Sequence, residues 1–576
     1  MFKPFLLLPL LLPLVWWAPR LGARLFRAIE TALNHLARRP GRAVLVVGLA
    51  SFVLSVILAA TIRVVPPHTH DEFGYLLIAD TFSHGRVTNP PHAHWPHFES
   101  VHVLQQPTYT SKYPPAQGLA LAIGQLLARL PMLGVWLTCA LASATVCWML
   151  MAWMKPRWAI VGGLLTAFHP QMIVWSQDYW GGAVALAGGA IVLGAFRRIL
   201  REPKTRDAIW LGLGMAILAN SRPYEGFVFS ALVCATLAVW FIRRRIKTGT
   251  WIVDRGAAGD AHPSAIAHPR SALRTVILPW AAIMVLLAAQ IGYYNARSTG
   301  SALRMPYVVC EATYGIAPLF IFQSPKPEPT YRHAELRALQ HDYLAFYRRQ
   351  VQSGWTLIAA TVHKIHIVLE SCLWSRLLLI PLLAAPWAIA GDRWLRLAIP
   401  GGLIFSEAML LGTWVSPHYA APGAAIFIVL VVTSMRWLKT FTLRGRRVGQ
   451  ALLRGTLCLC ALSSIFTIVR IAQIPEDRWD FQRARLLRQL DATPDRNLVF
   501  VRYQLGHNPH REWVYNSADI DSAHTVLARI LSPRENAKLR EYFRGHRLWM
   551  LEADAQPATL VQLDDPAQLP PVAPPR

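Results

Sequence analysis

The sequence predicts an α-helical polytopic membrane protein, with about 11–13 transmembrane helices and a small α/β domain at its C-terminal end. Hydrophobic residues make up 54% of the 576 residues and charged residues only 16%, whereas soluble proteins carry about 25% charged residues. Apolar segments long enough to cross a hydrocarbon core of roughly 30 Å recur as far as residue 472. After residue 472 these segments cease, and short strand and helix patterns follow.

The positive charge of the chain lies between its apolar segments. The formal net charge is +26, and residues 473–576 hold 14 basic and 14 acidic side chains, so the whole excess belongs to residues 1–472. A nucleic-acid-binding protein would concentrate this charge in a soluble module. Basic loops between spans follow the positive-inside rule instead, so we expect the lipid bilayer as a partner and no nucleic acid.

The N-terminal residues 1–42 predict an uncleaved anchor or an interfacial basic helix. An apolar run over 5–17 precedes a basic amphipathic stretch over 19–42, and no small-residue cleavage site follows the apolar run. The membrane domain is expected over 43–472. Its expected spans are 43–65, 133–154, 158–176, 180–196, 208–221, 223–242, 274–295, 377–391, 394–414, 419–436 and 450–472.

Two apolar stretches are expected not to cross. Residues 116–130 are short and read as re-entrant or tightly paired with the next span, and residues 355–371 read as an interfacial helix. The Gly/Ala/His/Pro-rich loop 243–273 is expected to be disordered.

The C-terminal domain, residues 473–576, is expected to combine strands and helices and to end in a Pro-rich tail over 566–576. The predicted strands are Asn497–Tyr503, Trp513–Tyr515 and Leu548–Glu552, and the predicted helices are Asp519–Leu531 and Glu535–Phe543.

The loops sort by charge into two sides. Arginine-rich loops alternate with loops that carry mixed polar, aromatic and Gly/Pro motifs, and the arginine-rich side must be cytoplasmic. The chain is therefore expected to be multi-pass in the cytoplasmic (inner) membrane. Its site and its C-terminal domain are expected on the extracytoplasmic side, with outer loops at 66–132 and 296–376. Candidate site residues among the outer motifs are Asp178, Tyr179, Glu225, Glu311, His418 and Tyr419.

Asp71 and Glu72 are the most informative of the outer residues, because they follow the first clear span directly. Adjacent residues on a helix point about 100° apart, so the two carboxylates cannot form a bridging acid pair. A carboxylate that faces a partly desolvated cleft can serve as a general base. The alternative is that Asp71 caps the N-terminus of the apolar helix that follows.

Cations at the outer boundary could hold a phosphate head group. They occur in Lys112-Tyr113-Pro114-Pro115, in Arg222-Pro223-Tyr224-Glu225 and in Arg304-Met305-Pro306-Tyr307. Arg would bind a phosphate in bidentate fashion and Lys as a point charge. The alternative for each cation is snorkelling to lipid phosphates.

Seven histidines lie in the loop 66–132, and His68, His70, His92 and His94 could bind a divalent metal together with a carboxylate. No helical His/Glu signature fixes a geometry, so we expect no metal cofactor. The seven cysteines lie mostly in apolar stretches, and nothing in their spacing indicates a disulfide framework.

A first span, an outer loop that opens with Asp71-Glu72, and then Lys112-Tyr113-Pro114-Pro115 resemble the GT-C superfamily of membrane glycosyltransferases. Within that superfamily the chain most resembles protein O-mannosyltransferases and lipid A aminoarabinose transferases, which use polyprenyl-phosphate sugars. The resemblance covers about residues 43–436. The resemblance implies that Asp71 is the catalytic base, with Glu72 beside it, and that Lys112 binds the lipid phosphate. In this chain Tyr113 separates Lys112 from the proline pair.

The function that the resemblance implies is an inverting transfer. A sugar would move from a polyprenyl-phosphate donor to an envelope glycan, lipid or protein on the extracytoplasmic face, with the lipid-linked donor as the one required ligand. Two other classes stay open. A secondary transporter or lipid-linked-sugar flippase would also place polar groups near helix ends, and a non-catalytic envelope assembly protein would use its outer α/β domain to bind a partner.

Overall fold

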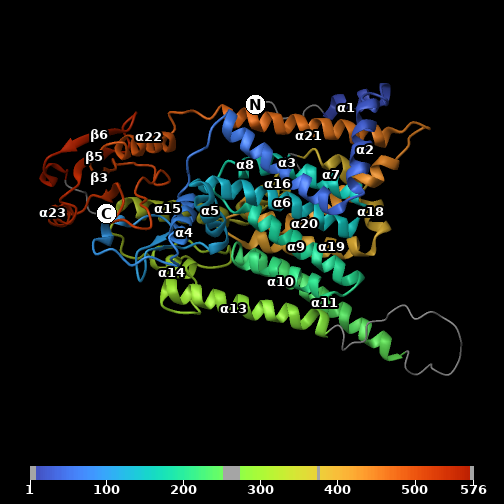
Figure 1. Cartoon of the computed structure of the whole chain (residues 1–576), viewed down its shortest axis with the longest axis horizontal. Helices are drawn as coiled ribbons and strands as arrows, with labels where there is room; N and C mark the ends of the chain where they lie inside the picture. Colours follow the sequence, from blue (N-terminus) through green and yellow to red (C-terminus); the bar gives the residue numbers. More distant parts are fainter. Residues whose placement is uncertain (1–7, 251–272, 373–375, 571–576) are drawn as a thin grey trace.

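The computed structural model describes residues 8–250, 273–372 and 376–570. A bundle of long helices forms the body, and a small domain with a sheet lies at one end of it (Figure 1). The segments 251–272 and 571–576 lie outside the described residues, so most of the predicted loop 243–273 and the end of the Pro-rich tail are not described.

Eight helices in the described part are long and apolar enough to cross a membrane. This confirms the predicted fold class, a helical polytopic membrane protein. The eight are α3 (Pro40–Thr61), α6 (Pro131–Trp153), α9 (Gly182–Arg201), α11 (Pro223–Thr250, apolar as far as Arg243), α13 (Leu278–Thr299), α19 (Arg393–Leu411), α20 (Pro417–Thr440) and α21 (Val448–Ala472). A π-helical turn, Leu273–Ile277, leads into α13.

Three of the predicted spans form shorter helices. The span 158–176 is broken into α7 (Pro156–Ala167) and α8 (Pro170–Trp175), because the residue before a proline avoids the helical region and His169 is extended. The span 208–221 forms α10 (Thr205–Ala219), and 377–391 forms α17 (Leu379–Leu382) and α18 (Ala385–Gly391). The sequence predicted 11–13 spans because it counted these three segments, whereas eight described helices are long and apolar enough to cross a membrane.

The other helices of the described chain are not among these eight. Helices α1 (Leu8–Trp17) and α2 (Ala23–Ala37) precede the first span, and no described residue of α2 is buried. Helix α5 (Pro115–Ala128) has 14 residues, about 21 Å of helix, which is short of a hydrocarbon core. The remaining helices are α4 (His70–Ser83), α14 (Pro306–Thr313), α15 (Ala334–Val351) and α16 (Gly354–Cys372).

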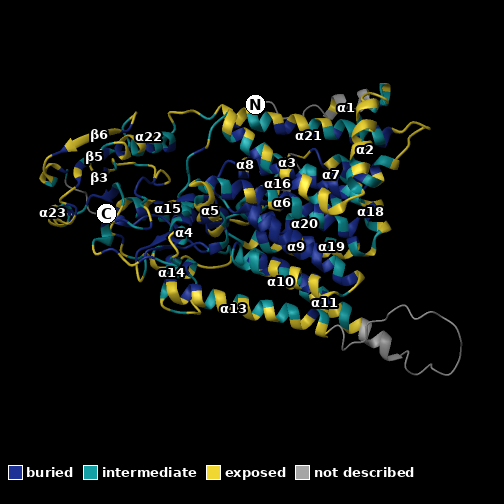
Figure 2. Cartoon of the chain, in the orientation of Figure 1, coloured by how far each residue is buried: buried dark blue, intermediate teal, exposed yellow. Residues whose placement is uncertain are grey.

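Helix α9 forms the centre of the bundle (Figure 2). Its small residues allow close packing, and nearly all of its side chains are buried against α6, α10 and α20. Helix α13 lies at the edge of the bundle, and its apolar side chains are mostly exposed (Figure 2). An apolar exposed helix of this kind suits contact with lipid.

The C-terminal domain contains α22 (Trp479–Asp491), α23 (Pro533–Tyr542) and a four-stranded sheet of order β4-β3-β5-β6. The strands are β3 (Asn497–Arg502), β4 (Thr525–Arg529), β5 (Arg547–Glu552) and β6 (Thr559–Leu563). Strand β3 is parallel to β4 and β5, and β6 is antiparallel to β5. A short 3₁₀ helix, Pro566–Gln568, follows β6.

Two secondary-structure predictions in this domain were wrong. Asp519–Leu531 was predicted as a helix, but its second half is β4, because pairing with β3 decides the structure of a short apolar run. Trp513–Tyr515 was predicted as a strand, but it joins no strand ladder: the Trp513 carbonyl accepts from Arg483 Nε at 3.1 Å instead. The predictions of β3, β5 and α23 are confirmed, whereas α22 and β6 were not predicted.

The C-terminal domain docks on α4 and on the loop that follows it. This loop carries a 3₁₀ turn (Trp95–Phe98) and a two-residue hairpin, β1 (Val103–Leu104) and β2 (Thr110–Ser111). The Ala518 N–H donates to Asp80 Oδ2 at 2.7 Å, and the Tyr515 ring stacks on the Phe73 ring at 4.1 Å. The buried Arg529 donates to the Glu99 carbonyl at 2.6 Å. These contacts place the domain directly over the N-terminus of α4.

Candidate active site

Asp71 and Glu72 lie in the first turn of α4, and their side chains point in different directions. Thr69 is the N-cap and Glu72 the third helical residue, which is the capping-box arrangement. The alternative interpretation of the sequence made Asp71 the cap, but it is Glu72 Oε2 that accepts from the backbone N–H of Thr69, at 3.0 Å. Asp71 and Glu72 have no partner in common, in agreement with the predicted angle between them.

Glu72 is completely buried and its two oxygens are fully used. Oε2 accepts from the backbone N–H groups of His68 (2.6 Å) and Thr69 (3.0 Å), and Oε1 accepts from that of Tyr179 (3.0 Å). Burial alone would raise the pKa of Glu72, but His68 and the backbone donors lower it below its usual value. Glu72 thus fastens the turn that holds Tyr179 to the start of α4.

Asp71 faces a polar cluster and keeps part of its surface open. Its side chain is 18% exposed, His70 Nδ1 lies 2.9 Å from Oδ2, and His102 Nε2 lies 4.0 Å from Oδ1. The Tyr113 hydroxyl donates a short hydrogen bond to Oδ1. Burial would raise the pKa of Asp71, but the two histidines and Tyr113 hold it well below its usual range. Asp71 is therefore an accessible carboxylate that stays ionised.

Gly74 allows Tyr113 to come this close to α4. A Cβ at position 74 would lie 2.8 Å from Ser111 Oγ and 3.0 Å from the Tyr113 ring. The Tyr113 ring also stacks on Tyr75 at 4.6 Å. Any larger residue at position 74 would push the Tyr113 hydroxyl away from Asp71.

Lys112 is a buried cation next to Tyr113 in the chain. Its Nζ lies 3.2 Å from Glu311 Oε1 and 4.7 Å from the centroid of the Tyr307 ring. Burial would lower the pKa of Lys112, but Tyr307 and Glu311 hold it well above its usual value. Lys112 is therefore charged, and Glu311 is its counter-ion.

Arg222 is a second cation of the same region. Its guanidinium carbon lies 4.7 Å from the centroid of the Tyr419 ring, and its side chain makes no hydrogen bond or salt bridge with the residues that the structure describes. The buried Tyr75 hydroxyl experiences the charges of Arg222, Asp71 and Lys112 together, although burial is the main reason that its pKa is raised. The three charges therefore converge on one space between α4, the Lys112 segment and the start of α11.

The remaining candidates lie around this centre or outside it. Tyr307 and Glu311 contact Lys112, as described. The His418 ring lies 4.2 Å from the Trp180 ring in a tilted arrangement and 4.6 Å from the Tyr419 ring edge to face, and Glu225 lies one turn after Arg222. Arg304 is exposed.

Asp178 is buried beside the centre. It accepts from the Trp180 N–H at 2.9 Å. Burial and the charge of Glu72 raise its pKa well above the usual value.

A group of three residues could hold a metal ion. The ligand atoms of His70, Asp71 and His102 lie within 4.8 Å of one another. Of the four histidines considered from sequence, only His70 belongs to it. His68 lies 3.1 Å from Glu72, His92 Nε2 lies 3.0 Å from Asp521 Oδ1, and the His94 N–H donates to His92.

Three neighbours of Asp71 were not singled out from sequence. His102 has a positive φ of 65°, a conformation that is uncommon outside glycine; its membership of a His-rich loop was the only signal. Tyr343 Oη lies 3.1 Å and His510 Nδ1 3.4 Å from His70 Nε2. They are 273 and 440 positions away from His70 in the chain, so no local pattern could have indicated them.

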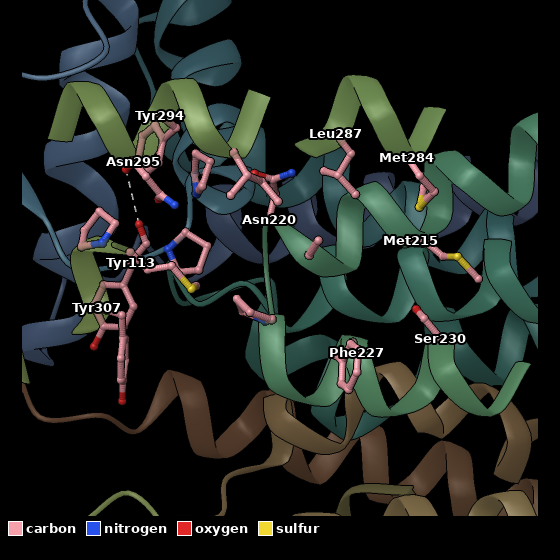
Figure 3. A pocket seen from close by; sticks show the side chains of 18 of the residues that line it. Tyr113, Met215, Asn220, Phe227, Ser230, Met284, Leu287, Tyr294, Asn295 and Tyr307 are labelled. Carbon is pink, nitrogen blue, oxygen red and sulfur yellow. Dashed lines mark hydrogen bonds between the residues drawn. The ribbon is translucent and has the colours of Figure 1, made fainter. Parts of the chain in front are cut away.

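A cavity of about 480 Å³ begins at Lys112, Tyr113 and Tyr307 and extends between α10, α11 and α13 (Figure 3). The Tyr294 hydroxyl donates to the Tyr113 carbonyl at 3.5 Å beside the polar end of the cavity. The extended part of the cavity is lined mainly by apolar side chains, among them Met215, Phe227, Trp280, Met284, Leu287 and Ile291. The cavity thus combines one charged end with a long apolar body.

Solved structures that match this chain include the Archaeoglobus fulgidus oligosaccharyltransferase and ArnT from Cupriavidus metallidurans. The Archaeoglobus fulgidus oligosaccharyltransferase in complex with Zn and sulfate has a TM-score of 0.48 and 13% identity over 84% of this chain, and the match covers 62% of that protein. ArnT from Cupriavidus metallidurans bound to undecaprenyl phosphate has a TM-score of 0.47 and 12% identity over 88% of this chain and 92% of ArnT. No protein-family model and no curated protein matches the sequence.

Proposed function

We propose that this protein is a membrane glycosyltransferase that moves a sugar from a polyprenyl-phosphate donor to an acceptor of the cell envelope. One observation carries the proposal: a long apolar cavity ends at the buried cation Lys112, and the next residue, Tyr113, bonds to the accessible carboxylate of Asp71. An isoprenoid tail with a phosphate at its end has the shape and polarity of this cavity.

The donor would lie with its tail between α10, α11 and α13 and its phosphate at Lys112. Helix α13 exposes its apolar side chains at the edge of the bundle, which suits lateral entry of a lipid from the bilayer. Arg222 is charged and its side chain makes no salt bridge in the described chain, so it can offer its guanidinium to the same phosphate. Glu311 would yield part of its contact with Lys112 when the phosphate binds.

The transfer step would invert the anomeric centre. The acceptor hydroxyl or amine attacks the anomeric carbon, its proton passes to Asp71, and the bond from the anomeric carbon to the phosphate oxygen breaks. Because its pKa is low, Asp71 is a weak base toward a neutral hydroxyl, so the proton would move late, as the acceptor becomes acidic during bond formation. Lys112 and Arg222 would offset the charge of the departing polyprenyl phosphate. Glu72 would hold α4 and the turn of Tyr179 in place.

The site and the C-terminal domain would face away from the cytoplasm. This assignment rests on the arginine-rich loops at the other end of the spans, which the positive-inside rule places in the cytoplasm. The C-terminal domain would also help to select the acceptor, because His510 and Tyr515 contact His70 and so lie beside Asp71.

The test is transfer by the purified full-length protein in liposomes. A panel of radiolabelled undecaprenyl-phosphate hexoses and pentoses is supplied with an envelope extract as the source of acceptor. Label that appears in a glycan, lipid or protein product, together with free undecaprenyl phosphate, supports the proposal. Label that crosses the bilayer without a new product indicates a flippase. Binding of envelope proteins with neither outcome indicates an assembly protein, and either result would overturn the proposal.

A further inference from the structure

A second cavity lies at the other end of the bundle from the candidate active site. It has a volume of about 500 Å³ and lies between the end of α9 and the start of α19. Helix α9 begins next to Trp180, whose ring contacts that of His418 at the active-site end, and its 20 residues span about 30 Å. None of the residues that the proposed reaction uses lines this second cavity.

The walls of the second cavity carry an excess of positive charge. Arg197, Arg201 and Arg393 line it together with a single acid, Asp392. The Asp392 carboxylate is already engaged, because Oδ1 accepts from the Trp394 N–H at 2.9 Å as the cap of α19. Its other oxygen, Oδ2, lies 4.0 Å from Arg197 Nη2. One carboxylate cannot neutralise three guanidinium groups, so the cavity favours an anion.

Arg197 is held in place but not satisfied. Its side chain is 11% exposed, and its guanidinium carbon lies 5.1 Å and 5.5 Å from the ring centroids of Trp153 and Trp394. Its Nε is buried and has no hydrogen-bond partner among the described residues. Buried donors are rarely left unpaired, so a bound acceptor would complete this position.

The next residue in the chain shows the contrast. Arg198 Nη1 donates to the Gly194 carbonyl at 3.0 Å, and Nη2 donates to the Trp148 carbonyl at 2.8 Å. Backbone carbonyls therefore accept the hydrogen bonds of Arg198, whereas the Arg197 Nε at the cavity keeps no such partner among the described residues.

The position of the cavity indicates a lipid rather than a soluble anion. It lies at the ends of α9 and α19, two helices that are long and apolar enough to cross a membrane, and thus at the depth of lipid head groups. Trp153 and Trp394 border the arginine as interfacial tryptophans do. Basic pockets between transmembrane helices commonly bind anionic head groups.

We propose that the cavity bounded by Arg197, Arg201 and Arg393 binds the phosphate of an anionic phospholipid at the end of the membrane domain opposite the active site. A soluble phosphate compound shares this chemistry, so the experiment compares both sources. The proposal is independent of the sugar transfer, since it uses none of the residues of that reaction.

The test is native mass spectrometry of the detergent-purified full-length protein, titrated separately with phosphatidylglycerol, phosphatidylcholine and glycerol 3-phosphate. We expect one phosphatidylglycerol per chain to bind at least tenfold more tightly than phosphatidylcholine. The double variant Arg201→Gln/Arg393→Gln should weaken that binding about tenfold or more, since each arginine offers a charge-assisted bond to the phosphate. Arg157→Gln, an exposed arginine at the start of α7, is the matched control and should change the binding less than twofold.

Equal binding of the two phospholipids, or equal losses in the double variant and the control, would overturn the proposal. Glycerol 3-phosphate that binds as tightly as phosphatidylglycerol would assign the cavity to a soluble anion and would equally overturn it. Arg197→Gln is measured as well, and Arg201→Gln alone guards against misfolding because Arg201 is exposed. An unchanged affinity in Arg201→Gln and in a folded Arg197→Gln would also count against the site.

Discussion

Replacing the two adjacent carboxylates one at a time separates their roles. Asp71→Asn keeps the size of the side chain and removes the proton acceptor. Asp71 is the accessible carboxylate of the pair, with a side chain 18% exposed, whereas Glu72 is wholly enclosed and cannot substitute for it. Loss of a general base costs about 10²–10⁴-fold in rate. We expect about 10³-fold here, or about 4 kcal/mol of transition-state stabilisation, because the side chains that remain within reach, His70 and His102, are imidazoles and not a second carboxylate.

Glu72→Gln should have the opposite profile. Backbone N–H groups donate to both oxygens of Glu72. In a glutamine one of these oxygens is replaced by an NH₂ group, which is a donor and cannot accept from a backbone N–H. The loss of hydrogen bonds to a buried charge costs roughly 1.5–3 kcal/mol each, so we expect a destabilisation of about 3 kcal/mol. The folded fraction of this variant should keep a catalytic rate within about tenfold of wild type.

The assay measures release of undecaprenyl phosphate from the lipid-linked sugar panel, and a parallel thermal unfolding curve measures stability. Asp71→Asn should lose kcat with an unchanged melting temperature, and Glu72→Gln should lose melting temperature with most of kcat retained. An Asp71→Asn protein that keeps more than a tenth of the wild-type kcat would refute the assignment of Asp71 as the base. A Glu72→Gln protein that is as stable as wild type would refute the structural role of Glu72.

Three further variants test the donor site and the electrostatics around the base. Lys112→Met should weaken binding of undecaprenyl phosphate about tenfold or more, since a charge-assisted contact is worth roughly 1.5–3 kcal/mol. Tryptophan fluorescence measures the binding, with Lys155→Gln, at an exposed lysine, as control. Ser230→Trp fills part of the cavity, so it should weaken binding of undecaprenyl phosphate about tenfold but of short geranyl phosphate less than threefold. Tyr113→Phe removes a donor that favours the ionised form of Asp71, so the pKa of Asp71 should rise. As the pH is lowered, kcat/KM should therefore begin to fall at a higher pH than in wild type.

Each of these has a result that would contradict it. If Lys112→Met binds undecaprenyl phosphate as tightly as Lys155→Gln does, the donor phosphate lies elsewhere. Equal effects of Ser230→Trp on the long and the short carrier would place the tail outside the cavity. An acid limb that stays at the same pH in Tyr113→Phe would mean that the ionisation of Asp71 does not govern kcat/KM.

Much of the membrane fold could be predicted because its signals are local. A continuous apolar run with charges at both ends indicates a span without any knowledge of its neighbours, and α3, α6 and α20 were found in this way. Pro170 could have indicated the break between α7 and α8, but the sequence analysis predicted one continuous span over 158–176. In the C-terminal domain β4 depends on pairing with β3, and a short apolar run gives no local sign of such pairing.

The candidate site divides in the same way. Asp71, Lys112 and Arg222 stand out because charge at a membrane boundary is unusual, and the structure brings the three together. The family resemblance implied Asp71 as the base, but local spacing alone could not distinguish Asp71 from Glu72, because their partners Tyr113 and Tyr179 reach α4 only in the folded chain. His510 is the extreme case, since it comes from another domain.

The two consecutive residues Lys112 and Tyr113 connect the two halves of the proposed reaction. Lys112 closes the polar end of the lipid cavity, and the Tyr113 hydroxyl donates to Asp71. The Lys112 ammonium lies 5.5 Å from the centroid of the Tyr113 ring, so one aromatic ring separates the cation from the base. An inverting displacement needs the attacking and leaving groups on opposite sides of one sugar ring, and a sugar ring is about as wide as the ring of a tyrosine. In the proposed reaction Tyr113 would therefore influence both the charge state of Asp71 and its distance from the leaving phosphate, which would explain a tyrosine between Lys112 and the proline pair.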